Sequence, residues 1–401
     1  MEPGELIIDQ PTLEACCRRW RELGCFAFDT EFIRDETYDA ALCLIQVSAD
    51  GEVVLIDPTA DIDVGVFWAL VTDPAVTTIV HAGKEDFDVC LRMTGKPPRN
   101  VFDVQLAAGL VGYHYPLSLT RLVEQALGQR ISKAQTLTDW LRRPLTAEQI
   151  RYAIDDVAHL PRIQEHLAER LEKAGRRAWA REEFQRFEDA AYYKPPTQDR
   201  VARIKGTKRL DGPGLVALEL LIEWRDRWAQ EKNRPVRALI RDDVIVEIAR
   251  RRPREPTELQ VLRGFPQSRN PKIINEVLAI IEKARQTPRD QWPAVHEPVE
   301  YAPMIRATLD LLSAVMRALC DEHGVSVDLV GSAQRLRELI DHDLGLTRET
   351  PALLSGWRGK FIGEPLRDLL RGRSELRFSG WPKEPLIEVV THERPADRAQ
   401  P

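Results

Sequence analysis

The sequence predicts an α/β domain with a mixed sheet and flanking helices, followed by two all-α helical domains. Three observations support this fold class. Short apolar runs alternate with helix-like stretches from residue 5 to about residue 105, and the pattern from residue 118 to about residue 186 is helical. Farther along, two proline-containing segments each precede another helical stretch. At about 150 residues per domain, a chain of 401 residues is expected to form several domains.

The predicted strands are five short apolar runs: ELII (5–8), CFAFDTEF (25–32), CLIQVSA (43–49), EVVLID (52–57) and TTIVHA (77–82). Asp50 and Gly51 separate the third run from the fourth, and this dipeptide signals a hairpin because both residues tolerate positive φ. A helix is expected from about Lys84 to Met93. Antiparallel strands followed by strands that alternate with helices indicate a mixed sheet with helices packed on it.

The remainder of the chain reads as helices separated by two linkers. Thr146 and Gln149 have the spacing of a capping box, at the start of a helical stretch that runs to about Arg186. A helical pattern at 214–233 returns at 304–324, which indicates a weak internal repeat. The predicted division is an α/β domain at 1–193, a linker at 194–213, a helical domain at 214–288, a linker at 289–303, a second and degenerate helical domain at 304–390, and a disordered tail at 391–401.

Composition excludes several classes of protein. No run approaches the roughly 18 consecutive apolar residues of a membrane span, and the N-terminal residues lack the pattern of a signal peptide. The six cysteines form no CxxC pair, which argues against a disulfide scaffold or zinc ribbon and predicts a cytoplasmic protein. No obligate protein partner is indicated. Residues 1–170 hold 16 basic and 27 acidic side chains, and these carboxylates either bind cations or form a solvated acidic surface.

Asp29 and Glu31 lie at the end of an apolar strand in CFAFDTEFIR. Residues i and i+2 of a strand point to the same face, so the two carboxylates project side by side. Like charges this close repel, and a divalent cation would neutralise them. The alternative is a strand end that runs into a polar loop.

Three further residues stand in similar settings. Asp86 follows a strand and a glycine turn, in the first turn of the next helix, where the helix dipole alone favours an acid. Tyr152 and Asp156 are four residues apart on a later helix and so share one face. An amphipathic helix with a surface acid and a packed tyrosine is the alternative for this pair.

In combination these motifs are more specific than any of them alone. A DxE strand, an Asp at a helix start and a later YxxxD helix together resemble the DEDD exonucleases of the tyrosine subclass. The segments HAGKED, FDVQLAA and TDWLRRPLTAEQIRYAIDDVAHL are similar to ribonuclease D, and the resemblance covers about residues 5–190. The helical units resemble HRDC domains, well over about 210–288 and in degenerate form over about 300–385. The resemblance implies a ribonuclease-H-like fold for the first domain.

The resemblance also implies a reaction, the hydrolysis of phosphodiesters from RNA 3′ ends. The resemblance implies that two Mg²⁺ (or Mn²⁺) ions per active site catalyse this hydrolysis. Such hard cations bind oxygen ligands, which carboxylates provide. By resemblance, Asp29, Glu31, Asp86 and Asp156 hold the metals, with Asp29 as the bridge, and Tyr152 orients the attacking water. The products would be nucleoside 5′-monophosphates, and tRNA precursors with a free 3′ end the expected substrates.

Contacts to the substrate are predicted at Thr30, Phe32 and His81. Phe32 could equally belong to the hydrophobic core. His81 could instead be a polar residue at a strand end whose hydrogen bonds are made within the protein. Asp103 is expected to cap a helix or to hydrogen-bond a residue that holds a metal, and Gln105 and Trp140 are expected to serve packing. The helical domains would guide structured RNA with basic and aromatic side chains. The candidates there are Arg225, Arg227, Lys232, Arg234, Arg237 and Arg241.

Two other functions remain open at this point. One is a DNA 3′–5′ exonuclease of the same fold, and the other is a non-catalytic adaptor that binds RNA. The four acids and the tyrosine are all present, which disfavours the adaptor.

Overall fold

The computed structural model describes residues 5–33, 37–38, 41–131, 139–265, 270–293, 303–380 and 386–391. The chain forms two compact units, one of residues 1–30, 45–189 and 301–401, and the other of residues 31–44 and 190–300. Their boundary runs through two strands of one sheet, so that sheet is described whole with the first unit.

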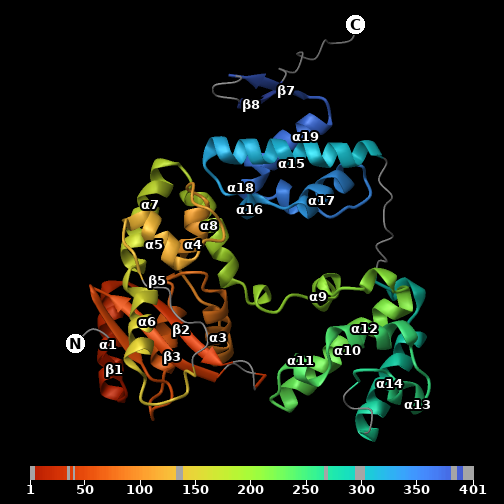
Figure 1. The fold of residues 1–401 in the computed structure, drawn as a ribbon, viewed down its shortest axis with the longest axis horizontal. Helices are drawn as coiled ribbons and strands as arrows, with labels where there is room; N and C mark the ends of the chain where they lie inside the picture. The colour runs from red at the N-terminus through yellow and green to blue at the C-terminus, as the bar shows by residue number, and fades with distance from the viewer. Residues whose placement is uncertain are drawn as a thin grey trace. The chain divides into compact units, whose positions relative to one another are not determined.

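A six-stranded mixed sheet is the centre of the first unit, as predicted (Figure 1). The strand order is β1-β4-β3-β2-β5-β6. β1 is parallel to β4, β5 is parallel to both β2 and β6, and β3 is antiparallel to β4. The strands are β1 (Glu5–Ile7), β2 (Cys25–Ile33), β3 (Ala41–Ala49), β4 (Glu52–Ile56), β5 (Thr77–Val80) and β6 (Val101–Asp103).

The expected hairpin between β3 and β4 is confirmed. Asp50 and Gly51 have φ values of 52° and 76°, and Ala49 pairs with Glu52 directly beside them. Positive φ at both central residues gives a turn whose twist matches that of the flanking strands.

Helices cover the sheet: α1 (Gln10–Leu23), α2 (Gly65–Val71), α3 (Lys84–Thr94), α4 (Val104–Gly109), α5 (Leu119–Leu127), α6 (Ala147–Ala158), α7 (Leu160–Lys173), α8 (Arg177–Gln185) and η1 (Arg186–Glu188). Aromatic side chains join them to the strands. Phe28 of β2 lies 5.5 Å from Phe67 of α2 and 5.8 Å from Phe87 of α3, measured between ring centroids. One face of β2 is therefore packed against α2 and α3.

The helical stretch expected from 146 to about 186 is divided into α6, α7 and α8. The capping box of Thr146 and Gln149 is present at the start of α6. α7 begins directly after His159, with proline among its first two residues, because a proline lacks the amide hydrogen that would continue the preceding helix. Gly175, at φ 66°, separates α7 from α8.

The C-terminal residues of the first unit form α15 (Pro303–His323), α16 (Val327–Val330), α17 (Ala333–Asp343), η5 (Ala352–Leu354), α18 (Gly356–Arg358), the π-helical turn η6 (Gly359–Gly363) and α19 (Glu364–Leu370). The helical prediction for 304–390 is wrong over its last part. There, β7 (Ser374–Ser379) and β8 (Leu386–Thr391) form an antiparallel pair. The β-branched run in LIEVVT suits a strand better than a helix. The tail predicted at 391–401 lies, beyond Thr391, outside the described residues.

These C-terminal helices pack directly on the helices that cover the sheet. The Ser326 amide donates to the Gly109 carbonyl at 2.8 Å, and Arg176 donates to the carbonyls of Leu110 and Gly324 at 2.7 and 3.1 Å. The indole of Trp357 stacks on that of Trp179 at 4.7 Å between centroids. The two parts of this unit therefore share a packed interface.

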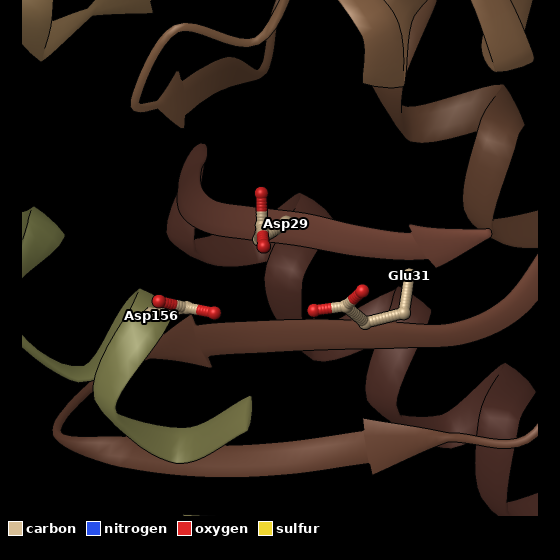
Figure 2. A group of neighbouring side chains, drawn as sticks. All are labelled: Asp29, Glu31 and Asp156. Carbon is tan, nitrogen blue, oxygen red and sulfur yellow. The ribbon is translucent and has the colours of Figure 1, made fainter. Parts of the chain in front are cut away.

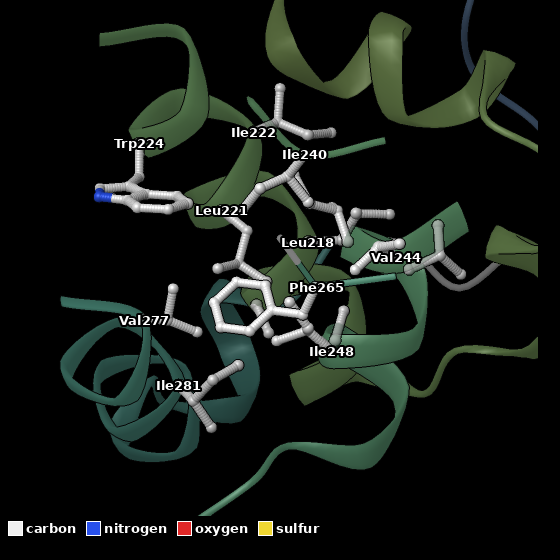
Figure 3. Close-up of a cluster of buried hydrophobic side chains, with 14 of the residues drawn as sticks. Leu218, Leu221, Ile222, Trp224, Ile240, Val244, Ile248, Phe265, Val277 and Ile281 are labelled. Atoms are coloured by element: carbon white, nitrogen blue, oxygen red, sulfur yellow. The ribbon is translucent and has the colours of Figure 1, made fainter. Parts of the chain in front are cut away.

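The second unit is helical, with η2 (Ala190–Tyr192), α9 (Thr197–Arg203), η3 (Thr207–Arg209), α10 (Gly212–Glu231), α11 (Val236–Leu239), α12 (Asp242–Arg251), α13 (Pro256–Gln260), α14 (Pro271–Gln286) and η4 (Arg289–Gln291). Its core joins α10, α12 and α14 (Figure 3). The fully buried side chains there include Leu218, Leu221, Ile222, Ile248, Val277 and Ile281.

The segment 194–213, expected from its composition to be a linker, contains α9 and η3. Val201 of α9 is buried in the core of the second unit, and Arg200 forms an ion pair with Asp226 of α10. This helix is therefore part of the packed unit. Within the described residues, no helix has the length and apolar composition needed to cross a membrane.

Candidate active site

Strand β2 presents its side chains to two different surroundings. Phe28 and Thr30 point toward α2 and α3, and strand alternation turns Asp29 and Glu31 to the opposite face. Asp29 and Glu31 are half-buried. The two carboxylates therefore project together from one face of the strand, as the sequence predicted.

Helix α6 brings a third carboxylate to this face. Carboxylate oxygens of Asp29, Glu31 and Asp156 all lie within 4.8 Å of one another. Figure 2 shows the carboxylates of Glu31 and Asp156 turned toward each other, with Asp29 beside the space between them. We call these residues the three-carboxylate group. Glu31 and Asp156 are 125 positions apart in the sequence, and the fold unites them.

Asp86 is not part of the three-carboxylate group. It lies in the first turn of α3, is 6% exposed, and its Oδ1 accepts hydrogen bonds from the amide and hydroxyl of Thr30 at 3.1 and 2.5 Å. It therefore approaches β2 from the side of Thr30. Gly83, which precedes α3, allows this because a Cβ there would lie 2.5 Å from Cγ2 of Val80.

Burial dominates the electrostatics of these acids. It raises the pKa of Asp86 to about 6, although hydrogen bonds from Thr30 lower it. It raises the pKa of Asp156 to about 7; a hydrogen bond from Tyr152 lowers that pKa, and the charges of Asp155 and Asp86 raise it. Asp86 is thus close enough for its charge to act on Asp156.

The donor set fits a divalent cation. Oδ2 of Asp156 is buried and has no hydrogen-bond partner among the described residues, which is costly for a carboxylate oxygen unless a ligand contacts it. The carboxylates of Asp29 and Glu31 converge with that of Asp156, and oxygen ligands of this kind suit Mg²⁺ or Mn²⁺. A bound cation would satisfy that oxygen and neutralise the repulsion among the three charges.

Tyr152 stands one turn before Asp156 on α6. Its ring lies 5.8 Å from the indole of Trp140, between centroids, with an interplanar angle of 42°. Trp140 is 8% exposed, in agreement with the packing role expected for it. The tyrosine that the sequence singled out is therefore held beside the three-carboxylate group.

The remaining predicted residues have defined partners. His81 Nε2 lies 2.9 Å from the Leu117 carbonyl, and Asp103 caps α4 by accepting from the amides of Gln105 and Leu106. The Thr30 hydroxyl donates to Asp86, a role that no pattern in the sequence predicted. Phe32 is half-buried. Substrate contacts by Thr30, Phe32 and His81 stay predictions.

Two of the basic candidates in the second unit line one pocket of about 520 Å³ between α10 and α14. They are Arg227 and Lys232, beside the stacked indoles of Trp224 and Trp228. Arg225 is different: it is 4% exposed and bonds Asp242 and the Ile240 carbonyl, so it is a structural residue.

Known families match three parts of the chain. Residues 5–172 match a 3′–5′ exonuclease family, residues 215–281 match the HRDC domain, and residues 303–366 match the C-terminal HRDC domain of ribonuclease D. The matches follow one another in chain order, with the exonuclease family over the acids described above.

Whole relatives and a solved structure are similar over nearly their full length. The chain is 34% identical to the ribonuclease D of Granulibacter bethesdensis and 33% identical to that of Gluconacetobacter diazotrophicus, and each alignment covers 94% of this chain and 94% and 95% of the relatives. The crystal structure of Escherichia coli RNase D, an exoribonuclease involved in structured RNA processing, matches with a TM-score of 0.79 at 30% identity. That match covers 92% of this chain and 99% of the other.

Proposed function

This chain belongs to the ribonuclease D family of 3′–5′ exoribonucleases, and on that premise we propose that it removes nucleotides one at a time from RNA 3′ ends with two divalent metal ions. The observation that carries this proposal is the three-carboxylate group, in which the buried Oδ2 of Asp156 finds no hydrogen-bond partner in the part of the chain that the structure describes. The products are nucleoside 5′-monophosphates.

Each acid has its own place in this proposal. Asp29, Glu31 and Asp156 would hold an ion between them, and Asp86, whose charge acts on Asp156, would contribute to binding the second ion. When bound, the ions would lower the pKa of a water molecule and neutralise charge on the scissile phosphate. The hydrogen bonds from Thr30 fix one oxygen of Asp86, so its carboxylate keeps one orientation.

Tyr152 would position the attacking water through its hydroxyl. A tyrosine with an ordinary pKa of about 10 is a weak base near pH 7, so orientation is the contribution expected of it. The ring is fixed against Trp140, and its hydroxyl reaches Asp156, which supports a position at the edge of the metal site.

We further propose that the natural substrates are structured RNAs, such as tRNA precursors, in the cytoplasm. The similarity to the E. coli enzyme, which acts in structured RNA processing, supports this substrate class. In this proposal the predicted domain at 1–193 hydrolyses the RNA, and the two helical domains at 214–288 and 304–390 guide the RNA to it.

A direct test uses a 5′-labelled RNA and the DNA of the same sequence, each with a free 3′ end. Stepwise shortening of the RNA alone, lost in EDTA and restored by Mg²⁺, is the expected result. Shortening of DNA at the same rate would favour the DNA exonuclease, and RNA binding without hydrolysis would favour the adaptor.

A further inference from the structure

The position of Tyr152 depends on the residues that hold Trp140. Tyr152 lies near the middle of α6, and the Trp140 ring that packs beside it belongs to the segment 139–146 that leads into this helix. No regular secondary structure fixes this segment. Its conformation must therefore come from side-chain contacts.

Arg143 makes the first of these contacts. Its Nε and Nη2 donate to the two oxygens of Asp57, at 2.5 and 2.7 Å, in a bidentate pair. Its remaining nitrogen, Nη1, donates to the carbonyl of Trp140 at 2.8 Å and to that of Arg142 at 3.1 Å. One guanidinium thus connects the backbone of Trp140 to the residue that follows β4.

Asp57 is a fixed anchor for this guanidinium. It is 4% exposed, and its Oδ1 also accepts from the amide and hydroxyl of Thr59, at 3.0 and 2.6 Å. Both oxygens of the carboxylate are therefore bonded in the fold. Asp57 directly follows β4, so the sheet sets its position.

Gln149 fixes the same segment from the other side. This buried residue accepts from the Thr146 amide at 2.8 Å and donates to the Asp139 carbonyl at 3.1 Å. It belongs to the first turn of α6, the helix that carries Tyr152. The segment 139–146 is thus fastened at one point to the helix and at another to the sheet.

An ion pair in which Asp57 is buried and the Arg143 side chain is only 24% exposed is a costly way to gain stability alone. An apolar contact of similar size would stabilise the segment equally well, because burial of two charges largely offsets their attraction. A bidentate pair adds a defined direction, which an apolar contact does not. The pair therefore suits a site at which orientation matters.

From these contacts we propose that Arg143, held by Asp57, is a positioning residue for Tyr152. It fixes the Trp140 backbone and so sets the surface against which the tyrosine ring packs. This inference rests on the proposed function, since it assumes that the Tyr152 hydroxyl acts in hydrolysis.

A double-mutant cycle on the full chain tests the inference. We expect Arg143→Ala to lower kcat about 10- to 100-fold with little change in KM, because a small misplacement of a catalytic group has an effect of this size. Tyr152→Phe lowers kcat as well, and the double variant is no slower than Tyr152→Phe alone. Effects that multiply in the double variant would overturn the inference, because Arg143 would then act independently of Tyr152.

Three further variants keep the test decisive if Arg143→Ala does not fold. Arg143→Lys keeps the positive charge but cannot form the bidentate pair with Asp57, and Asp57→Asn weakens the same pair by removing the negative charge. Both variants are expected to lower kcat by less than Arg143→Ala does. This loss should be absent when the substitution is made together with Tyr152→Phe. Arg142→Ala, at an exposed neighbour, should leave kcat unchanged. Full activity of Tyr152→Phe would instead contradict the proposed role of the tyrosine, and with it this inference.

Discussion

The hydroxyl of Thr30 lies 2.5 Å from Oδ1 of Asp86, and the Thr30 amide donates to the same oxygen at 3.1 Å. Thr30 stands between Asp29 and Glu31 on β2. Side chains alternate along a strand, so Asp29 and Glu31 project from one face of β2 while Thr30 projects from the other. Three consecutive residues therefore supply two acids of the site and the hydrogen-bond donor that holds a third acid, Asp86.

We predict that Thr30→Val lowers kcat about tenfold, because the variant keeps the shape of the side chain but leaves Asp86 without its hydroxyl donor. A hydrogen bond to a charged group contributes about 1.5–3 kcal/mol. Steady-state hydrolysis of a short unstructured RNA measures the effect. Thr30→Ser, which restores the hydroxyl, is the matched control, and equal activity of the valine and serine variants would disprove the role.

Asp29→Asn is expected to abolish hydrolysis while RNA binding is retained. The substitution removes one charge from the three-carboxylate group but keeps the size of the side chain. Hydrolysis of 3′-ends and binding by fluorescence anisotropy, measured on the same preparation, separate the two effects. Asp9→Asn, at the cap of α1, is a control outside the site. An Asp29→Asn protein with full activity would refute the assignment of this acid.

Stability in EDTA should fall as the pH rises from about 4 to about 7. The pKa of Asp156 is raised to about 7 by burial and that of Asp86 to about 6, from an ordinary value of 3.8. Above pH 4 the unfolded chain releases these protons more readily than the folded chain, so unfolding becomes more favourable. Thermal unfolding across this pH range provides the measurement.

In Asp156→Asn the same decline should be smaller, because one of the two titrating groups is absent. Mg²⁺ should raise the Tm of the natural protein most at pH 7 and above, where the carboxylates have lost their protons. Identical pH dependence of the two proteins would show that Asp156 is not the group responsible.

The packing of the C-terminal helices on α8 should depend on Glu183. This residue is 1% exposed and accepts hydrogen bonds from Arg358 at 2.5 Å and from the Trp357 indole at 2.8 Å. Burial raises the pKa of its carboxyl, but the bonds and charge of Arg358 outweigh burial and hold that pKa below its ordinary value. The ionised form therefore stabilises the fold, and this contribution is lost as the pH falls through that lowered pKa.

Glu183→Gln should therefore lower the stability by about 3 kcal/mol at pH 7, since it leaves Arg358 nearly buried and unpaired, and by less at pH 4. Thermal unfolding at both pH values measures this. Glu172→Gln, which removes an exposed ion pair with Arg177, should have an effect below about 1 kcal/mol. Equal effects of the two substitutions would show that the buried pair is no more important than a surface one.

Local signals in the sequence were enough to predict the strands and the helix that carry the site residues. The apolar run at residues 25–32 predicted β2, Asp50 and Gly51 predicted the hairpin, and the spacing of Thr146 and Gln149 predicted the start of α6. Each of these signals lies within a few residues, where backbone preferences and side-chain periodicity decide the outcome. The acids Asp29 and Glu31 were found in the same way, by their two-residue spacing.

Only the tertiary structure decided which distant side chains meet. Asp57 and Arg143 are 86 positions apart, and Thr30 and Asp86 are 56 apart, so no local pattern pairs them. The same holds for the position of Asp86, which reaches Thr30 because α3 packs against β2. The sequence by itself determined the elements and the chemical groups, because these depend on neighbours along the chain. The partners of those groups depend on how strands and helices pack, and this packing follows from contacts across the whole domain.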